Sequence, residues 1–413
     1  MKTYSKYLTI AVLLILQVVF NTTLAGAQTQ GTFGSGLTWA ISSDGTLRIG
    51  GNGAMPVSLL AAAGLQPWES VRNTITAVII EDGVTTLGLG AFDGCTMLNS
   101  VTIGKGITVI PDWIVRGTNI TSVTIPEQII RIENDAFNGA NKLETVYFNA
   151  VNCTDGLSVY TGAPFAIGKC PALKTIIIGD TVQRIPESIF SEISSLTSLT
   201  IGKNVTAIGR HAFRDCPNLT HIVIPDSVQT VDYRAFYGCA GVISITLGSE
   251  LSEIGIQAFA GSRITEITIP ENVSKIRSGS FGNSARLRTV YFNAANCENV
   301  DVDSPFSDCQ RLEIMDFGNS VRQIPAYIAK GLRSLYGITI GSRVNTIGNY
   351  AFSGCISLEE IINRAARPQV LVGSGNGNFD NTDKSFCCLF VPSGSISAYS
   401  SANVWKDFQI SSL

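Results

Sequence analysis

Ten cysteines are the residues of this chain most able to do chemistry, because a thiol can form a disulfide, ligate a metal or act as a nucleophile. Five of them lie at the same position of a repeated sequence, three residues after a phenylalanine or its equivalent: Cys95, Cys216, Cys239, Cys309 and Cys355. Other copies of the repeat carry Ala140, Ser262 and Ser284 at this position, which we call the cysteine slot. A slot filled by Cys, Ala or Ser selects a small buried side chain, so we expect reduced, structural cysteines. A disulfide between neighbouring copies is the alternative, since stacked strands lie about 5 Å apart.

Histidines and carboxylates form no recognisable catalytic or metal-binding motif. His211 and His221 are the only histidines, and we interpret both as solvated surface residues. The stretch GNGNFDNTDKS, residues 375–385, alternates acid and amide oxygens but lacks the closing Glu of a calcium loop. We interpret it, like Asp301 and Asp303, as polar loop, with Ca²⁺ binding as the alternative. The sequence therefore predicts no catalytic residue, no metal site and no cofactor.

The cysteine slot belongs to a repeat. Its Ala-Phe phrase recurs at Phe92, Phe137, Phe213, Phe236, Phe259 and Phe352, with Ser280-Phe281 as a variant. A second phrase, aliphatic-x-x-aliphatic-x-aliphatic, starts at Ile75, Leu98, Ile120, Leu143, Leu173, Leu196, Leu219, Val242, Ile264, Leu287, Leu312, Leu335 and Leu358. A period of about 22–25 residues predicts a mainly-β repeat solenoid of about 12–13 coils, whose stacked units bury one continuous core.

One copy shows how the residue types direct the chain. In LTHIVIP, residues 219–225, Ile222 and Ile224 alternate with Val223, a pattern typical of a short strand with one buried face. The proline that follows has no backbone N–H to donate to a neighbouring strand, so it ends the strand. SVQTV predicts a second short extended piece, and DYRAFYGC closes the coil with Phe236 turned inward.

A longer period overlies the short one. ETVYFNAVNC, residues 144–153, returns as RTVYFNAANC, residues 288–297, which is 144 residues later. Both copies carry extra residues before a Pro-Phe pair, at Pro164-Phe165 and Pro305-Phe306. We interpret the extra residues as loops that project from one side of the stack, in a block of repeats that was duplicated whole.

Residues 1–27 are predicted to be a secretory signal peptide. Two lysines precede an apolar run from Leu8 to Phe20, and Ala25-Gly26-Ala27 provides a small-x-small cleavage site. A membrane anchor is the alternative, but a span needs about 20 apolar residues. The formal charge of −3 gives no basic excess for nucleic acid or an anionic membrane. We expect an exported protein without a membrane span, extracellular or at the cell surface, with the periplasm as the alternative.

The repeat resembles the BspA-like leucine-rich repeat family of bacterial cell-surface and secreted proteins. The residues that carry the resemblance are LTSLTIGKNVTAIGRHAFRDCPNLTHIVIPDSVQTVDYRAFYGC, residues 196–239, and its copies over residues 75–362. The resemblance implies a leucine-rich repeat array and roles in adhesion and interaction, often with host or matrix proteins.

The flanks of the array look like caps. LTWAISSDGTLRIGGNGAMP, residues 37–56, resembles the N-terminal hairpin of that family, and LFVPSGSISAYSSANVWKDF, residues 389–408, its closing segment. We expect an N-terminal β-rich cap over residues 28–74, the solenoid over 75–362 and a C-terminal cap over 363–413. Solenoid ends expose core, so aromatic residues should cover them: Trp39, Trp68, Tyr399, Trp405 and Phe408.

Two function classes fit these features. The first is a non-catalytic secreted or cell-surface protein that mediates adhesion or binds a protein partner, such as a host or matrix protein or another surface protein. The alternative is a solenoid enzyme acting on polysaccharide, or a glycan-binding protein. Such an enzyme needs paired carboxylates or a clustered Arg/Lys/Asp site on one face. Of the predicted outward strand positions only Asp316 is acidic, which favours binding over catalysis.

The predicted binding residues interrupt an otherwise plain outward surface of Thr and aliphatic residues. They are Tyr147 and Asn149 in one duplicated block and Tyr291 and Asn293 in the other. Tyrosine supplies contact area and a hydroxyl, and aromatic residues are enriched at interfaces. Ordinary sheet packing of Tyr is the competing interpretation. If binding lies elsewhere, we expect it along an outward basic row: Arg131, Arg184, Lys275 and Arg322.

Overall fold

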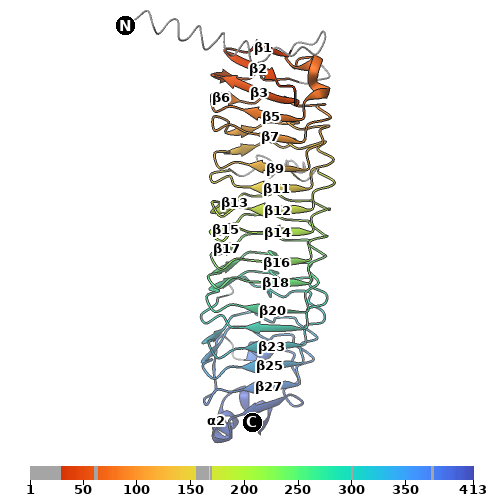
Figure 1. Ribbon diagram of the computed structural model, residues 1–413. Helices are drawn as coiled ribbons and strands as arrows, with labels where there is room; N and C mark the ends of the chain where they lie inside the picture. Colours follow the sequence, from red (N-terminus) through yellow and green to blue (C-terminus); the bar gives the residue numbers. More distant parts are fainter. Residues whose placement is uncertain (1–28, 60–63, 155–166, 168–169, 299–300, 374–375) are drawn as a thin grey trace, which may run out of the picture.

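A computed structural model describes residues 29–59, 64–154, 167, 170–298, 301–373 and 376–413 of the chain. The predicted signal peptide and the Pro164-Phe165 pair lie outside the described residues. The chain forms one elongated, mainly-β solenoid of about 14 turns, with its strands stacked like rungs from the N-terminal to the C-terminal end (Figure 1). The predicted repeat solenoid is therefore confirmed.

A long row of main strands runs along one side of the solenoid, divided by hydrogen bonding into sheets of five, four, two and seven strands, and we refer to this row as the main sheet. It begins with the antiparallel strands β1 (Gln30–Phe33) and β2 (Leu37–Ile41), and β2 also pairs with β3 antiparallel. From β3 onward neighbouring strands that pair are parallel and in register. These strands are β3 (Thr46–Gly51), β5 (Ala77–Ile80), β7 (Ser100–Thr102), β9 (Ser122–Ile125), β11 (Thr145–Phe148), β12 (Thr175–Ile178), β14 (Ser198–Thr200), β16 (His221–Val223), β18 (Ser244–Thr246), β20 (Glu266–Ile269), β22 (Thr289–Phe292), β23 (Ile314–Phe317), β25 (Gly337–Ile340), β27 (Glu360–Asn363), β29 (Cys388–Val391) and β30 (Gln409–Ser412).

Shorter parallel strands form a second face. They are β4 (Gly53–Ala54), β6 (Val84–Thr86), β8 (Val109–Ile110), β10 (Arg131–Ile132), β13 (Arg184–Ile185), β15 (Ala207–Ile208), β17 (Thr230–Val231), β19 (Glu253–Ile254), β21 (Lys275–Ile276), β24 (Gln323–Ile324), β26 (Thr346–Ile347) and β28 (Val370–Leu371). The second extended piece predicted from SVQTV is β17. Most of the described coils thus contribute one main strand, a connection, one short strand and a closing turn.

Alternation of side chains in the main strands follows the predicted pattern. Ile222 and Ile224 are buried, whereas Val223 is 61% exposed. Successive side chains of a strand point to opposite faces, so β-branched residues at every second position fill the core. About half of the outward positions carry Ser or Thr, and most of the others carry aliphatic, aromatic or charged residues.

Stacked phenylalanines form a column through the core. Ring centroids of neighbours lie 5.1–5.7 Å apart with interplanar angles of 4–14°. The members of this column are Phe190, Phe213, Phe236, Phe259, Phe281 and Phe306. One Ala-Phe phrase per coil places one ring above the next, because each coil repeats the same backbone path.

The cysteine slot lies beside this column. All ten cysteines are free thiols, which confirms the predicted reduced state. The thiol of Cys239 donates to the carbonyl oxygen of Phe213 at 3.2 Å, and that of Cys309 to Phe281 at 3.2 Å. Burial raises the pKa of Cys309 to about 12. Cys309 is therefore a protonated thiol and a poor nucleophile. The contacts from sulfur to carbonyl oxygen connect neighbouring coils.

Aromatic residues cover both ends of the core, as predicted. At the N-terminal end Trp68 stacks on Phe92 with ring centroids 5.9 Å apart, next to η2 (Glu69–Thr74). At the C-terminal end Trp405 and Phe408 contact Phe379 at 5.6 and 5.2 Å. The closing segment contains η4 (Ser393–Ser395), α2 (Ile396–Ser401) and η5 (Trp405–Asp407), and β29 and β30 extend the main sheet.

The segment GNGNFDNTDKS differs from the expected polar loop. Its described part begins with η3 (Asn376–Phe379), and Asn378 and Phe379 are fully buried. Phe379 stacks on Phe352 at 5.4 Å, and the Asn378 amide donates to the carbonyl oxygens of Ile347 and Gly348. The buried amide thus has hydrogen-bond partners inside the core, as buried polar groups require.

Candidate functional site

The outward face of the main sheet carries both predicted tyrosines. Tyr147 of β11 and Tyr291 of β22 are each 41% exposed. Tyr147 lies between Thr124 and Ile177, and Tyr291 between Thr268 and Asp316. Within the described part of the chain, neither tyrosine hydroxyl has a hydrogen-bond partner. Both side chains therefore present an aromatic ring and a free hydroxyl to solvent.

The two tyrosines lie on the same face but do not form one compact site. The strands between them in the stack are β12, β14, β16, β18 and β20. At about 4.8 Å per strand the two rings are roughly 30 Å apart. A partner that contacts both must therefore follow the solenoid axis, and a small ligand reaches only one.

The two predicted asparagines are half-buried at the ends of these strands. A Cβ built on Gly179 would lie 2.1 Å from Asn149 Oδ1, and one on Gly318 would lie 2.2 Å from Asn293 Oδ1. Each asparagine amide thus occupies the space over a glycine of the next coil. This arrangement is the same in both duplicated blocks and contributes to packing between coils.

The second duplicated loop returns to the core at its end. Phe306 is buried and stacks on Phe281 at 5.7 Å, so the Pro305-Phe306 pair supplies the missing ring of the phenylalanine column. Asp301 accepts hydrogen bonds from Arg277 Nε at 2.9 Å and from the Ser278 N–H at 2.7 Å. Burial alone would raise the pKa of Asp301, but these hydrogen bonds and the Arg277 charge hold it below its usual value.

The predicted basic row is not continuous. Arg131, Arg184 and Lys275 are the first residues of β10, β13 and β21, but Arg322 precedes β24, whose first residue is Gln323. The coils between them carry Ala207, Thr230 and Glu253 in the same position. Including Arg322 in this row was wrong, because it lies two residues before the isoleucine of its short strand, whereas the other three basic residues directly precede theirs. Arg322 belongs to a different surface feature.

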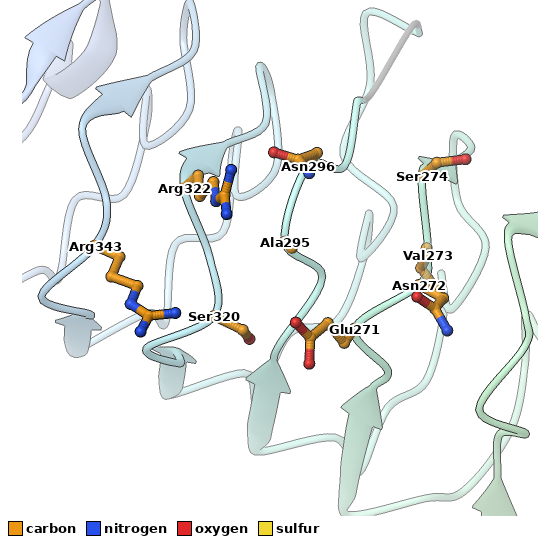
Figure 2. Close-up of a pocket in the computed structure, with 9 residues that line it drawn as sticks. All are labelled: Glu271, Asn272, Val273, Ser274, Ala295, Asn296, Ser320, Arg322 and Arg343. Atoms are coloured by element: carbon orange, nitrogen blue, oxygen red, sulfur yellow. The ribbon is translucent and has the colours of Figure 1, made fainter.

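That feature is a polar hollow, which the sequence did not indicate. It has a volume of about 350 Å³ and lies where four consecutive main strands, β20, β22, β23 and β25, connect to the second face (Figure 2). The lining residues are Glu271, Asn272, Val273, Ser274, Ala295, Asn296, Ser320, Arg322 and Arg343. Ser320 Oγ donates to the Asn293 carbonyl oxygen at 2.6 Å, so the hollow adjoins one of the predicted site residues.

A second feature that the sequence analysis missed surrounds His211. This residue adopts φ 54° in a closing turn, and its half-buried ring packs edge-on against Tyr233, with ring centroids 5.1 Å apart. Arg210 and Arg234 lie over the Tyr233 ring, with Cζ 5.3 and 5.0 Å from its centroid. Burial and the charges of Arg214, Arg210 and Arg234 lower the pKa of His211 to about 4. The predicted solvated position is thus wrong for His211, whereas His221 is exposed on β16 as expected.

The described residues contain neither a cluster suited to metal binding nor a helix able to span a membrane. No three His, Cys, Asp or Glu side chains in that part of the chain come together as metal ligands. Nor does any helix within it have the length and apolar character to cross a membrane.

Comparisons with known proteins give one family and several similar structures. The family model described as BspA type leucine rich repeat region, in six copies, matches residues 71–161, 163–288 and 289–382. A leucine-rich repeat protein from Bacteroides ovatus is 16% identical, with 92% of this chain and 99% of that chain covered and a TM-score of 0.43. One from Eubacterium ventriosum is 22% identical, with 81% and 90% covered and a TM-score of 0.39. A leucine rich cell surface protein from Faecalibacterium prausnitzii is 21% identical, with 86% and 99% covered and a TM-score of 0.33. Among curated proteins none matches this chain.

Proposed function

Because the chain belongs to the family of BspA-type leucine-rich repeat proteins, we propose that it is an exported, non-catalytic protein that binds a partner protein along the outward face of its main sheet. Repeat proteins of this kind use one extended surface for recognition. The partner class that fits is a host or matrix protein, or another surface protein, in keeping with a predicted signal peptide at the N-terminus.

The observation that carries this proposal is the pair of exposed tyrosines. Tyr147 and Tyr291 project from the outward face, where their strand neighbours are Thr124, Ile177, Thr268 and Asp316, and each tyrosine is 41% exposed. Large aromatic side chains with a free hydroxyl dominate the energetics of many protein interfaces. Their separation of roughly 30 Å suits a protein-sized partner.

Catalysis has less support. The buried thiols of Cys95, Cys309 and Cys355 have pKa values raised to about 12 by burial, so they are not activated nucleophiles. Asp316 stands on the outward face between Tyr291 and Thr339, without a carboxylate beside it in those two neighbouring positions. We expect no turnover of a panel of glycan and ester substrates by the mature chain, and hydrolysis of any of them would contradict the proposal.

The test of the binding face is the double substitution Tyr147→Ala with Tyr291→Ala. Binding to purified extracellular-matrix and surface proteins should be measured by surface plasmon resonance with residues 28–413. Loss of both rings should raise the Kd of the tightest-binding partner by about 30-fold or more, since truncating an aromatic hot spot costs about 2 kcal/mol or more of binding free energy. The melting temperature should hardly change, because both side chains are outside the core.

The matched control is Thr124→Ala with Thr268→Ala. These threonines are the strand neighbours of the two tyrosines on the same face. The control should retain binding, since it removes only small hydroxyls. Full binding by a folded tyrosine double variant would place the interface on another surface of the solenoid.

A further inference from the structure

Three charged side chains of the polar hollow lack protein partners. Among the residues that the structure describes, the Glu271 carboxylate and the Arg322 and Arg343 guanidinium groups make no ion pair or side-chain hydrogen bond. Nearby arginines differ, since Arg277 binds Asp301 at 2.9 Å and Arg288 binds Glu313 at 2.8 Å. In Figure 2 the two arginines lie on one side of the hollow and Glu271 lies across from Arg343, with Ser320 between them.

The duplicated block provides an internal comparison for this hollow. Strand pairing aligns β22 and β23 with β11 and β12, since Tyr291 pairs with Asp316 as Tyr147 pairs with Ile177. Glu127, Asn152 and Thr181 then correspond to Glu271, Asn296 and Ser320. The arginines have no counterpart, because the equivalent positions hold Gln183 for Arg322 and Asn204 for Arg343. Both guanidinium groups are therefore specific to the second block, on a backbone that also accepts neutral amides.

The chemistry of the lining selects a particular ligand. Two guanidinium groups on one wall suit a carboxylate, which arginine binds with paired charge-assisted hydrogen bonds. The facing Glu271 accepts hydrogen bonds from hydroxyl groups and repels a second negative charge. Asn296 and Ser320 add further polar groups, and no aromatic or large apolar side chain lines the hollow.

We propose that this hollow binds one carboxylated sugar residue of an acidic glycan. The carboxylate lies between Arg322 and Arg343, and the ring hydroxyls bond to Glu271, Asn296 and Ser320. A volume of about 350 Å³ is at the small end of known ligand pockets and accommodates a single sugar ring, and the open side lets a chain extend away. A sulfated glycan would bring more negative charge against Glu271, whereas a uronate ring offers one carboxylate to the arginines and several hydroxyl donors to Glu271.

The test measures oligosaccharide binding to residues 28–413 by isothermal titration calorimetry. The probes are a hyaluronan tetrasaccharide, which carries glucuronate, a neutral chitotetraose and a heparin tetrasaccharide. We expect the glucuronate probe to bind and the neutral probe not to bind. Replacing both arginines by the residues of the first block, Arg322→Gln with Arg343→Asn, should weaken binding by about tenfold or more, because charged hydrogen bonds are lost.

The charge control is Arg311→Gln with Arg333→Asn, which removes two positive charges from exposed positions outside the hollow. It should bind the glucuronate probe like the unchanged protein. A second variant, Glu271→Gln, keeps both arginines and should shift preference toward the heparin probe.

The proposal is overturned by equal binding of the neutral probe, by unchanged affinity of the Arg322/Arg343 variant, by equal loss in the charge control, or by no glucuronate binding at millimolar concentration. None of these outcomes bears on the tyrosine face, which is tested by protein partners.

Discussion

Partial burial, together with the charges of three arginines, keeps the ring of His211 neutral in the folded protein. Its pKa is about 4 in the fold, against 6.5 for an ordinary histidine, so protons bind more tightly to the unfolded chain. The stability contributed by neutral His211 is complete above pH 6.5 and is lost as the pH falls toward 4. His211→Asn removes this titration, and Asn tolerates the turn's positive φ of 54°. Thermal unfolding between pH 7.5 and pH 4.5 should therefore show a smaller fall in melting temperature for the variant.

The exposed histidine supplies the control for this titration. His221 lies on the outward face of β16, and its ring contacts Thr220 Oγ1 at 2.9 Å. His221→Asn should keep the pH dependence of the unchanged protein. An identical slope for His211→Asn and the unchanged protein would show that the arginine surroundings do not affect stability.

At the scale of elements, the phenylalanine column and the alternating strands separate core from surface. Phe236 is fully buried between Phe213 and Phe259, at centroid distances of 5.1 and 5.4 Å. Phe236→Ala should destabilise the protein by about 3–5 kcal/mol, because it leaves a cavity in the middle of the column. Val223→Ala removes a side chain that is 61% exposed and should cost about 0.5 kcal/mol or less. Denaturant unfolding followed by circular dichroism compares the two, and equal losses would refute the inward and outward assignment.

At the scale of the whole molecule, stacking makes an elongated particle. From β1 to β30 the main sheet is roughly 80 Å long at about 4.8 Å per strand (Figure 1). Small-angle X-ray scattering of residues 28–413 should give a maximum dimension of roughly 90 Å once side chains and caps are included. A compact protein of this length has a radius of gyration of about 21 Å, and the solenoid should exceed that value. A spherical scattering profile would be incompatible with the stack.

The sequence by itself determined the architecture, because a solenoid is built from local rules that every copy repeats. The alternation of residues in LTHIVIP specified which side chains of β16 are buried. The repeated Ala-Phe sequence specified the phenylalanine column. The position shared by Cys, Ala and Ser specified free, buried thiols. Tyr147 and Tyr291 were found on the outward face for the same reason, since side-chain direction in a strand has a period of two.

Only the tertiary structure decided what lies between coils. Glu271, Ser320 and Arg343 come from different connections, and their side chains share one hollow because the coils stack in register. The position of the Asn149 amide over Gly179 depends on how the connection after β11 bends. The same holds for His211, whose neighbours Tyr233 and Arg234 belong to the next coil. Spacing along one chain fixes which coil a residue belongs to, whereas contacts across coils depend on turn geometry that the repeat pattern does not encode.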